Sequence, residues 1–239
     1  MGRIRGWPAT LCEPDLLDAP VVLRPIRVSD ARARRQVREE DIGWLRPWDP
    51  SAPDALLATS SAEPLRSMIW HSPAGPYVSV MRRRRWARRG KALIWAVRYG
   101  DQFAGQLSVW SITWGANHSA QVGYWVDERF AGRGIAPTAL ALAADFCFQV
   151  AGLHRLEASI QPGNAASRRV VEKLGFREEG LRVREVHIDG AWRDHVCYAI
   201  TAEEAPYGLL PRWRHSSAVS RPGTQCGSDP ASFPVVQGI

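Results

Sequence analysis

Val126-Asp127-Glu128-Arg129-Phe130-Ala131-Gly132-Arg133-Gly134-Ile135-Ala136 connects a β-rich segment, residues 120–126, to residues 135–150, where apolar side chains recur at helical spacing. Glycines at 132 and 134 let the backbone approach a ligand closely and take conformations that a Cβ forbids. A helix that begins there directs its unpaired N–H groups and its positive dipole end at the loop. The stretch therefore predicts an anion site that suits a pyrophosphate, and Arg129 and Arg133 add positive charge.

The Gly-x-Gly spacing has two interpretations when taken alone, because it also occurs in ordinary tight turns between a strand and a helix. It lacks the Gly-Lys-Ser/Thr of a Walker loop and does not complete a GxGxxG fingerprint. Further along the chain, Gln161-Pro162-Gly163-Asn164-Ala165-Ala166-Ser167 opens a second helix that ends near Leu174-Gly175-Phe176. This second pattern favours the ligand-binding interpretation.

Together these residues resemble the GNAT superfamily of N-acetyltransferases. Arg129-x-x-Gly132-x-Gly134-Ile135-Ala136 matches that family's Q/R-x-x-G-x-G/A pyrophosphate loop, and Asn164-x-x-Ser167 with Leu174-Gly175-Phe176 matches its second signature helix. The ribosomal-protein-alanine branch, of the RimJ/RimL type, is the most similar. The likeness covers about residues 20–203 and extends to Leu23-Arg24-Pro25, Trp44-Leu45-Arg46-Pro47-Trp48 and Asp189–His195.

The order of the expected elements is β-α-α-β-β-β-α-β-α-β-β, which predicts an α/β fold with a sheet of mixed direction and helices on both faces. The resemblance implies the GNAT fold, with a mostly antiparallel sheet that is splayed between its fourth and fifth strands. Strands are expected at 21–25, 92–97, 103–112, 120–126, 154–160, 176–188 and 192–200. Helices are expected at 30–40, 63–89 with an interruption at 72–76, 135–150 and 164–174.

The ends of the chain differ in composition from its middle. Residues 1–19 are rich in Pro, Gly and Arg and predict a loose N-terminal arm. Residues 20–203 form the expected acetyltransferase domain, and 204–239 lose the apolar periodicity and predict a flexible C-terminal extension. The segment 44–53 is rich in Trp and Pro and is expected to be a loop.

The resemblance implies acetyl-CoA as the co-substrate and no metal. Its pantetheine arm would lie in the splayed gap and pair with the backbone of Tyr124, Trp125 and Val126 like an added strand. Its pyrophosphate would lie beside Arg129 on the N–H groups of Ala131, Gly132, Arg133, Gly134, Ile135 and Ala136. Asn164 is a natural N-cap residue and, by resemblance, also touches the cofactor.

Acetyl transfer needs a neutral amine, a polarised carbonyl and a proton for the departing thiolate. By resemblance Ser167 supplies that proton, while Val171 stands where many relatives carry a tyrosine. A local bond to the Asn164 cap is the alternative role of Ser167. Glu157 is a candidate base, with a salt bridge as its alternative role. Ser159 and His187 leave the assignment of the base open.

The preferred acceptor is a primary amine, specifically the N-terminal α-amine of a ribosomal protein, acetylated by direct attack in a ternary complex. An α-amine has a pKa of about 7.7–8.0, so a weak base or a water chain suffices. Two alternatives are a small-molecule amine, such as an antibiotic or metabolite, and a non-catalytic acyl-CoA-binding or ribosome-associated module.

The chain has 239 residues and a net charge of +7, with a sequence pI of about 9.7, which suits anionic partners. The basic run Arg82–Arg89 predicts contact with RNA or the ribosome, or is simply a solvated helix face. The sequence shows no secretory signal and no stretch of the roughly 20 apolar residues that span a bilayer. We expect a cytoplasmic monomer or homodimer that has no contact with membranes.

Overall fold

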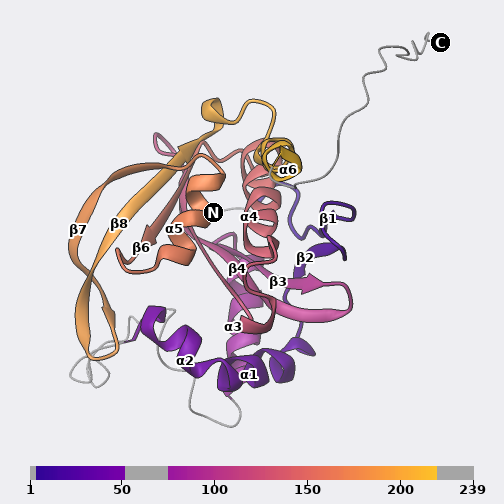
Figure 1. Ribbon diagram of the computed structural model, residues 1–239, viewed down its shortest axis with the longest axis vertical. Coiled ribbons are helices and arrows are strands. Elements are labelled where there is room, and N and C mark those ends of the chain that lie inside the picture. The colour runs from indigo at the N-terminus through magenta and orange to yellow at the C-terminus, as the bar shows by residue number, and fades with distance from the viewer. Residues whose placement is uncertain (1–3, 52–74, 220–239) are drawn as a thin grey trace.

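The computed structural model describes residues 4–51 and 75–219, which form one eight-stranded sheet with helices on both faces (Figure 1). The sheet order is β1-β2-β3-β4-β5-β6-β8-β7, and every neighbouring pair is antiparallel except β5 and β6. The strands are β1 (Leu11–Glu13), β2 (Val21–Pro25), β3 (Ala92–Tyr99), β4 (Gln102–Thr113), β5 (Ser119–Val126), β6 (Arg155–Ile160), β7 (Arg177–Ile188) and β8 (Ala191–Thr201).

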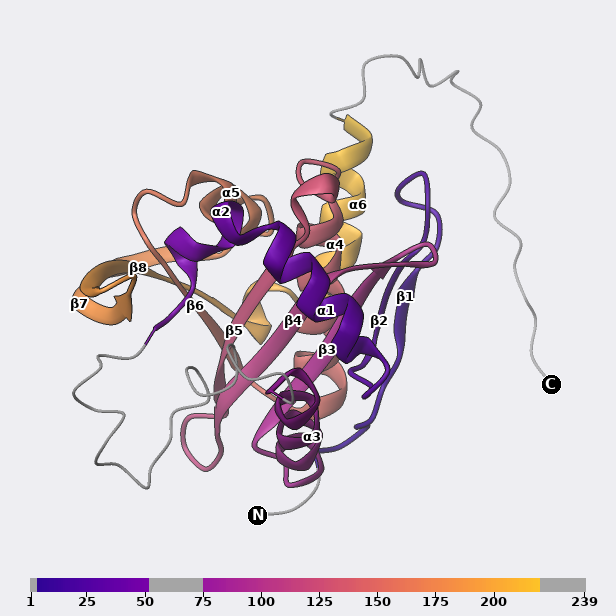
Figure 2. The ribbon, with the colours of Figure 1, turned by 90° about the horizontal axis from the view of Figure 1, so that it is seen from below.

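The helices form two layers. Figure 2 shows α1 and α2 in front of the sheet, with α4 and α6 behind it. The front layer contains α1 (Asp30–Glu40), α2 (Ile42–Leu45), the short turn η1 (Arg46–Trp48) and α3 (Gly75–Arg88). The rear layer contains α4 (Ile135–Asp145), its π-helical continuation η4 (Phe146–Ala151), α5 (Ala165–Lys173) and α6 (Leu209–Val219). Two short 3-10 turns, η3 (Glu128–Phe130) and η5 (Ala202–Glu204), complete the described elements.

The predicted splay lies between β5 and β6. These strands pair in parallel over three positions only, from Ser119 opposite Arg155 to Gln121 opposite Glu157. Beyond Gln121 the strands diverge, while β5 stays paired with β4 and β6 stays paired with β8. Backbone groups on the two facing edges therefore need another partner. The prediction of a mostly antiparallel sheet that opens at this place is confirmed.

Two hairpins follow the turn chemistry of the sequence. Gly100 and Asp101 join β3 to β4, and Asp189 and Gly190 join β7 to β8. Asp189 and Gly190 both have positive φ, 46° and 81°, which matches a two-residue hairpin turn of type I′. This geometry extends β7 and β8 as a long ribbon beside the cavity described below.

The expectation of a loose arm over residues 1–19 is wrong for the described part. β1 adds an edge strand beside β2, Ile4 is buried, and the rings of Trp7 and Trp95 meet edge to face at 4.9 Å. A three-residue strand carries too little alternation to be recognised, and its anchor Trp95 lies far along the chain. The sheet therefore begins before residue 20.

The expectation of a coreless extension from residue 204 is also wrong up to the end of α6. Leu209 and Trp213 are buried against the rear layer. The N–H groups of Leu209 and Leu210 are capped by the carboxylate of Asp145, at 2.6 and 3.1 Å. This cap comes from another helix, so no local signal marks the start of α6. The helix expected at 63–71 lies outside the described residues.

Candidate active site

The loop after β5 has the geometry of an anion cradle. Gly132 and Gly134 have φ of 77° and 83°, and α4 begins directly afterwards at Ile135. A Cβ on Gly134 would meet Leu17 at 3.3 Å and Trp213 at 3.5 Å, so the position is both left-handed and crowded. The N-terminal N–H groups of an eleven-residue helix therefore face the loop, where they suit a phosphate group.

A cavity of about 730 Å³ runs from this loop through the split in the sheet. Its volume lies in the range of small-molecule sites. The front layer, the facing ends of β5 and β6, and the start of α5 all contribute side chains. The predicted residues that line it are Tyr124, Trp125, Val126, Ala131, Gly132, Gly134, Ile135, Ala136, Asn164 and Ser167.

Two predicted cofactor-binding arginines lie outside the lining. The guanidinium of Arg129 pairs with both oxygens of Asp127, the closest contact being 2.5 Å, and its side chain is 58% exposed. Asp127 also accepts the backbone N–H of Arg129 at 2.9 Å, so the pair clamps the loop. Arg133 is exposed and its guanidinium lies 5.8 Å from the Phe130 ring centroid. Their direct contact with a pyrophosphate remains a prediction.

The Trp/Pro-rich segment after α1 forms the cover of the split rather than a plain loop, since it contains α2 and η1. The indole N–H of Trp44 donates to the carbonyl of Val126 at 3.3 Å. The side chain of Gln161 donates to the carbonyl of Pro47 at 2.8 Å, and the N–H of Ser51 donates to the carbonyl of His187 at 2.8 Å. These three bonds connect the front layer to β5, to the start of α5 and to β7.

Ser167 and Tyr124 meet at the cavity wall. The Tyr124 phenol oxygen lies 3.1 Å from the Ser167 hydroxyl and also donates to the Ser167 carbonyl at 3.3 Å. Burial raises the pKa of Tyr124 above its ordinary value despite the bond to Ser167, so the phenol stays protonated at neutral pH. When Tyr124 gives its single proton to the Ser167 hydroxyl rather than to the Ser167 carbonyl, the Ser167 proton can point into the cavity that Ser167 lines.

Asn164 caps α5 as its sequence predicts. Its side-chain oxygen accepts the backbone N–H of Ser167 at 3.0 Å. The cap therefore uses the main chain of Ser167 and leaves the hydroxyl to Tyr124. The backbone N–H of Ser167 therefore serves the helix cap, while the side-chain hydroxyl stays available for proton donation.

Glu157 is engaged in ion pairs on the strand face next to the cavity. Its carboxylate accepts from Arg155 at 2.8 Å and from Arg182 at 3.0 Å. Burial acts to raise the pKa of Glu157, but the hydrogen bonds and charges of the two arginines outweigh it and lower that pKa. A carboxylate held in this way is a weak base. A catalytic role for Glu157 stays a prediction, and the geometry supports its structural alternative.

Of the two other candidates for the base, Ser159 and His187, only Ser159 lines the cavity. Ser159 lines the cavity and donates to Glu185 at 3.3 Å. Glu185 also accepts from Arg182 at 2.9 Å, and its second carboxylate oxygen is buried without a hydrogen-bond partner among the described residues. His187 is not among the lining residues, and its Nδ1 lies 2.9 Å from the Ser51 hydroxyl oxygen.

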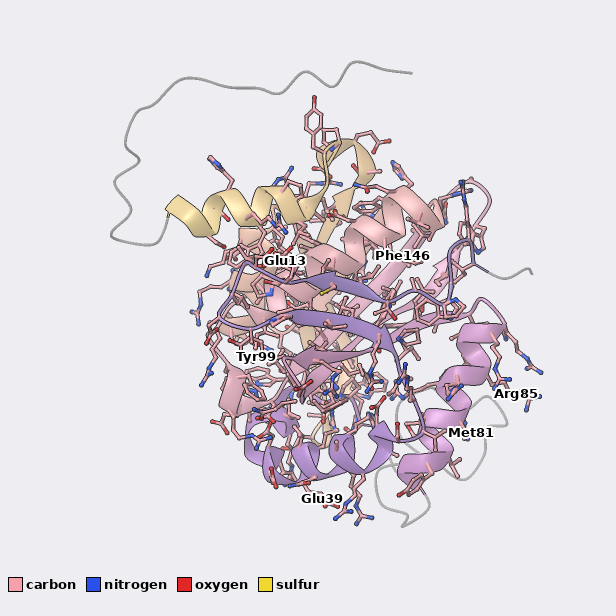
Figure 3. The ribbon with its side chains drawn as sticks, turned by 90° about the vertical axis from the view of Figure 1, so that its right-hand side faces the viewer. Glu13, Glu39, Met81, Arg85, Tyr99 and Phe146 are labelled. Atoms are coloured by element: carbon pink, nitrogen blue, oxygen red, sulfur yellow. The ribbon has the colours of Figure 1, made fainter. Side chains whose placement is uncertain are left out.

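Three arginines of the front layer line the cavity: Arg34 and Arg38 from α1, and Arg83 from α3. Arg83 belongs to the basic run that was expected to be solvent-facing or to bind RNA. The arginines of this run face in different directions. Arg83 faces the cavity, and four others are exposed: Arg84, Arg85, Arg88 and Arg89. Figure 3 shows Arg85 directed away from the body of the molecule.

A family model described as an acetyltransferase (GNAT) domain matches residues 21–177. The chain belongs to the GNAT family. RimJ of Mycobacterium smegmatis, solved in complex with CoA-disulfide, is 37% identical to this GNAT chain, with a TM-score of 0.76 over 90% of this chain and 97% of that one. The [ribosomal protein uS5]-alanine N-acetyltransferase of Escherichia coli is 25% identical over 201 residues, covering 83% of this chain and 96% of the relative.

A third relative is more similar over a shorter stretch. The probable N-acetyltransferase YjcK of Bacillus subtilis is 41% identical over 100 residues, which is 42% of this chain and 55% of that relative. The family match confirms that this GNAT chain is an N-acetyltransferase. The expectation of acetyl-CoA as the co-substrate is confirmed for the family, since the M. smegmatis relative was solved with a CoA species bound.

Two features are absent from the part of the chain that the structure describes. Within residues 4–51 and 75–219, no group of three or more His, Cys, Asp or Glu side chains is placed to hold a metal ion. No helix in the same part of the chain has the length and apolar content needed to cross a bilayer.

Sequence reasoning missed several residues of the GNAT cavity. Trp44, Arg34 and Arg38 lie in segments predicted as loop or polar helix, and nothing in their local pattern marks them as cavity residues. Gln106 and Trp110 lie on β4, where alternation predicts two faces but not which face is open. The signal that could have found them is the alternation of polar residues on β4 at 106 and 108, which is unusual for a buried strand.

Proposed function

We propose that this chain transfers the acetyl group of acetyl-CoA to the N-terminal α-amine of a protein, with a ribosomal protein as the first candidate acceptor. The charge of the cavity is the observation that supports this class of acceptor. Among the described lining residues, Asp49 is the one carboxylate, and it is paired with Arg38, while Arg34 and Arg83 add positive charge. A polycationic small amine is repelled by such a wall.

The reactivity of the amine supports the same choice. An α-amine titrates near pH 7.7–8.0, so a large fraction is neutral at physiological pH, whereas a lysine amine near pH 10.4 needs a strong base. The one carboxylate among the described lining residues, Asp49, is paired with Arg38 and is therefore a weak base, and Glu157, outside the lining, is held by Arg155 and Arg182. The printed activity of the E. coli relative, alanine N-acetylation of ribosomal protein uS5, supports a protein acceptor.

The residues present fit acetyl-CoA. The edge of β5 beyond Gln121 offers backbone groups that a pantetheine arm can satisfy, as an added strand would. Gly132 and Gly134 leave the cradle free of side chains at the start of α4. When bound, acetyl-CoA supplies an activated acyl group. Tyr124, Trp125 and Val126 would hold its arm, and Ala131 to Ala136 its phosphates.

For the transfer, the protein then has to position the two substrates and to supply one proton. The acceptor nitrogen forms a bond to the acetyl carbonyl carbon as the carbon–sulfur bond breaks, and it loses a proton to water. Ser167 donates a proton to the departing sulfur and regains one from solvent or through Tyr124. A thiol titrates near pH 8.5, so modest stabilisation of the departing thiolate is enough.

The test is a screen of N-terminal peptides and small amines, with thiol release as the readout. We expect turnover with peptides and a loss of about 10²-fold or more in kcat for Ser167→Ala, the scale of one general acid. Turnover with small amines alone would contradict the protein acceptor. Activity of Ser167→Ala equal to that of the natural chain would contradict the role of Ser167. If nothing turns over while acetyl-CoA still binds, the chain is a binding module.

Contact with the ribosome is a separate part of the proposal. The exposed arginines of α3 support it, because clustered guanidinium groups bind RNA phosphates in a salt-dependent way. Replacing Arg84, Arg85, Arg88 and Arg89 with glutamine should slow acetylation of the ribosome-bound acceptor and leave the free peptide unaffected. Equal rates on both acceptors would contradict this contact.

A further inference from the structure

The front wall of the cavity concentrates positive charge from two helices. Arg34 and Arg38 lie one turn apart on α1, and Arg83 reaches the same space from α3. The charge of Arg83 acts on both Arg34 and Arg38, and the charge of Arg38 also acts on Arg34. Several positive charges gathered at one wall attract an anion that enters the cavity.

The three side chains are fixed rather than free to move into solvent. Arg34 is 3% exposed and its Nε donates to Gln106 on β4 at 2.9 Å. The Nε of Arg83 donates to the Ser79 hydroxyl at 3.3 Å. Arg38 lies 5.4 Å from the centre of the Trp125 ring and forms an ion pair with Asp49. Such positioning suits the planar, two-point binding of a carboxylate.

Burying these arginines close together carries an electrostatic cost. Burial, followed by the charges of Arg83 and Arg38, lowers the pKa of Arg34 well below its ordinary value. Burial and the charge of Arg83 lower the pKa of Arg38 to about 9, and burial lowers the pKa of Arg83 to about 10. Arg38 and Arg83 remain charged at neutral pH. The pair of Arg38 with Asp49 shows that this wall already accepts a carboxylate of the chain itself.

The wall is separate from the phosphate cradle. Arg34 contacts Gln106 and Arg38 contacts Trp125, so both lie on the face of β4 and β5 that the front layer covers. The cradle begins α4, in the rear layer, and Tyr124 points to that rear side, where it meets Ser167. The other cations among the described lining residues, Arg169 and Lys173, are on α5 in the rear layer. The front arginines are thus placed toward the acceptor and away from the phosphates of the donor.

We infer that Arg34, Arg38 and Arg83 bind a carboxylate within the first few residues of the acceptor, so that the enzyme prefers N-termini followed closely by Asp or Glu. This inference rests on the proposed function, because it gives the sequence class of the protein acceptor. An acidic side chain satisfies the wall, while the α-amine reaches the split where the thioester lies. A peptide with lysine at the same place meets three like charges.

The experiment uses peptides with one common N-terminal residue. Asp or Glu at position 2, 3 or 4 is compared with its amide, Asn or Gln, and with Lys, and kcat/KM is measured by thiol release. We expect about a 10-fold or greater preference for the acid over its amide at one position, the scale of a hydrogen bond to a charged group. We expect that preference to decrease as salt is added.

The key variant is Arg83→Gln, which should bring the ratio of acid to amide close to one while the KM for acetyl-CoA stays unchanged. The ratio is measured within one preparation, so partial unfolding lowers both rates equally and leaves it intact. Arg32→Gln is the matched control, since Arg32 lies on α1 close to Arg34 but is exposed. It should keep the preference of the natural chain.

Three results would overturn the inference. The first is equal turnover of acid and amide peptides by the natural chain, which would contradict the anionic subsite but not the protein acceptor. The second is an Arg83→Gln variant that keeps the full preference. The third is an Arg83→Gln variant in which only the KM for acetyl-CoA increases, which would assign the wall to the donor. Absence of turnover with every peptide is a different failure, because it contradicts the proposed function itself.

Discussion

The phenol oxygen of Tyr124 lies 3.1 Å from the hydroxyl oxygen of Ser167, and this contact connects the free edge of β5 to the first turn of α5. The sequence places Val171 where many relatives carry a tyrosine, so that position supplies no phenol. The structure supplies one from a different element. A hydroxyl pair fixed from two sides holds the serine in one orientation.

Tyr124→Phe should therefore lower kcat, by about 10-fold, and by less than Ser167→Ala, because the serine keeps its proton but loses its orientation. The double variant should be no slower than Ser167→Ala alone, since the two act as a unit. Thiol release under saturating acetyl-CoA measures this. Ser216→Ala, on α6, is the control and should retain full activity. Fully additive effects of the two substitutions would contradict a shared role.

Glu157→Gln should lower stability more than activity. The pKa of Glu157 is lowered in the folded state, so its stabilising contribution is present above the ordinary glutamate pKa and is lost as the pH falls through the folded value. Glu179, which shares Arg155, has its pKa lowered to about 2, mainly by the hydrogen bond from Arg155. Urea unfolding of the natural chain should thus show stability decreasing from about pH 5 downward.

At pH 7 the variant should lose about 1–3 kcal/mol, because Arg155 and Arg182 remain without one of their partners. Its loss of stability with acid should be less steep than that of the natural chain. Glu39→Gln is the control, since its pair with Arg35 is exposed and contributes about 0.3–0.5 kcal/mol. A large loss of kcat with unchanged stability would instead establish Glu157 as the base.

Gly134→Ala should weaken binding of acetyl-CoA. The position combines a φ of 83° with a contact of 3.3 Å to Leu17, so an alanine strains the loop by about 1–2 kcal/mol or shifts it. The KM for acetyl-CoA should increase while the KM for the acceptor stays unchanged. Gly43→Ala on α2 is the matched control, because its Cβ meets nothing within 4 Å. An unchanged KM for acetyl-CoA would show that the loop does not contribute to the binding of acetyl-CoA.

Trp213→Ala should destabilise the chain by about 3–5 kcal/mol, as expected for a buried aromatic ring. Trp213 is 7% exposed, and its indole N–H donates to Thr138 on α4 at 2.9 Å. It also backs Gly134, so surviving protein should bind acetyl-CoA more weakly. Tyr207→Ala, at a side chain that is 87% exposed, should leave both properties unchanged. Thermal unfolding with and without CoA measures the two effects.

Local patterns in the sequence predicted the parts of the fold whose causes are local. The glycines at 132 and 134, the Asn164 cap and the Asp189-Gly190 turn each act within a few residues, and each was placed correctly. The split between β5 and β6 came from resemblance to a family. No residue pattern of either strand reveals where pairing stops.

Features that depend on contacts across the chain were not predicted. Asp145 caps α6 from 64 positions earlier. Arg34 and Arg83 meet only after α1 and α3 are laid on the same sheet face. Polar residues of this kind look like solvated helix surface until the fold places them together. This explains why the glycine loop and the Asn164 cap were predictable and the arginines of the front wall were not.

The three-residue pairing of β5 with β6 gives this sheet two interior edges. Edges of sheets are usually hazards at the outside of a protein, where they recruit strands from other molecules. In this protein the unpaired edges lie inside the molecule. The front layer covers them through Trp44, and they are accessible where a ligand enters. CoA would therefore act as a chaperone for its own enzyme, by occupying the edges on which stray chains could otherwise add. Purification in its presence should favour the dispersed protein over aggregates.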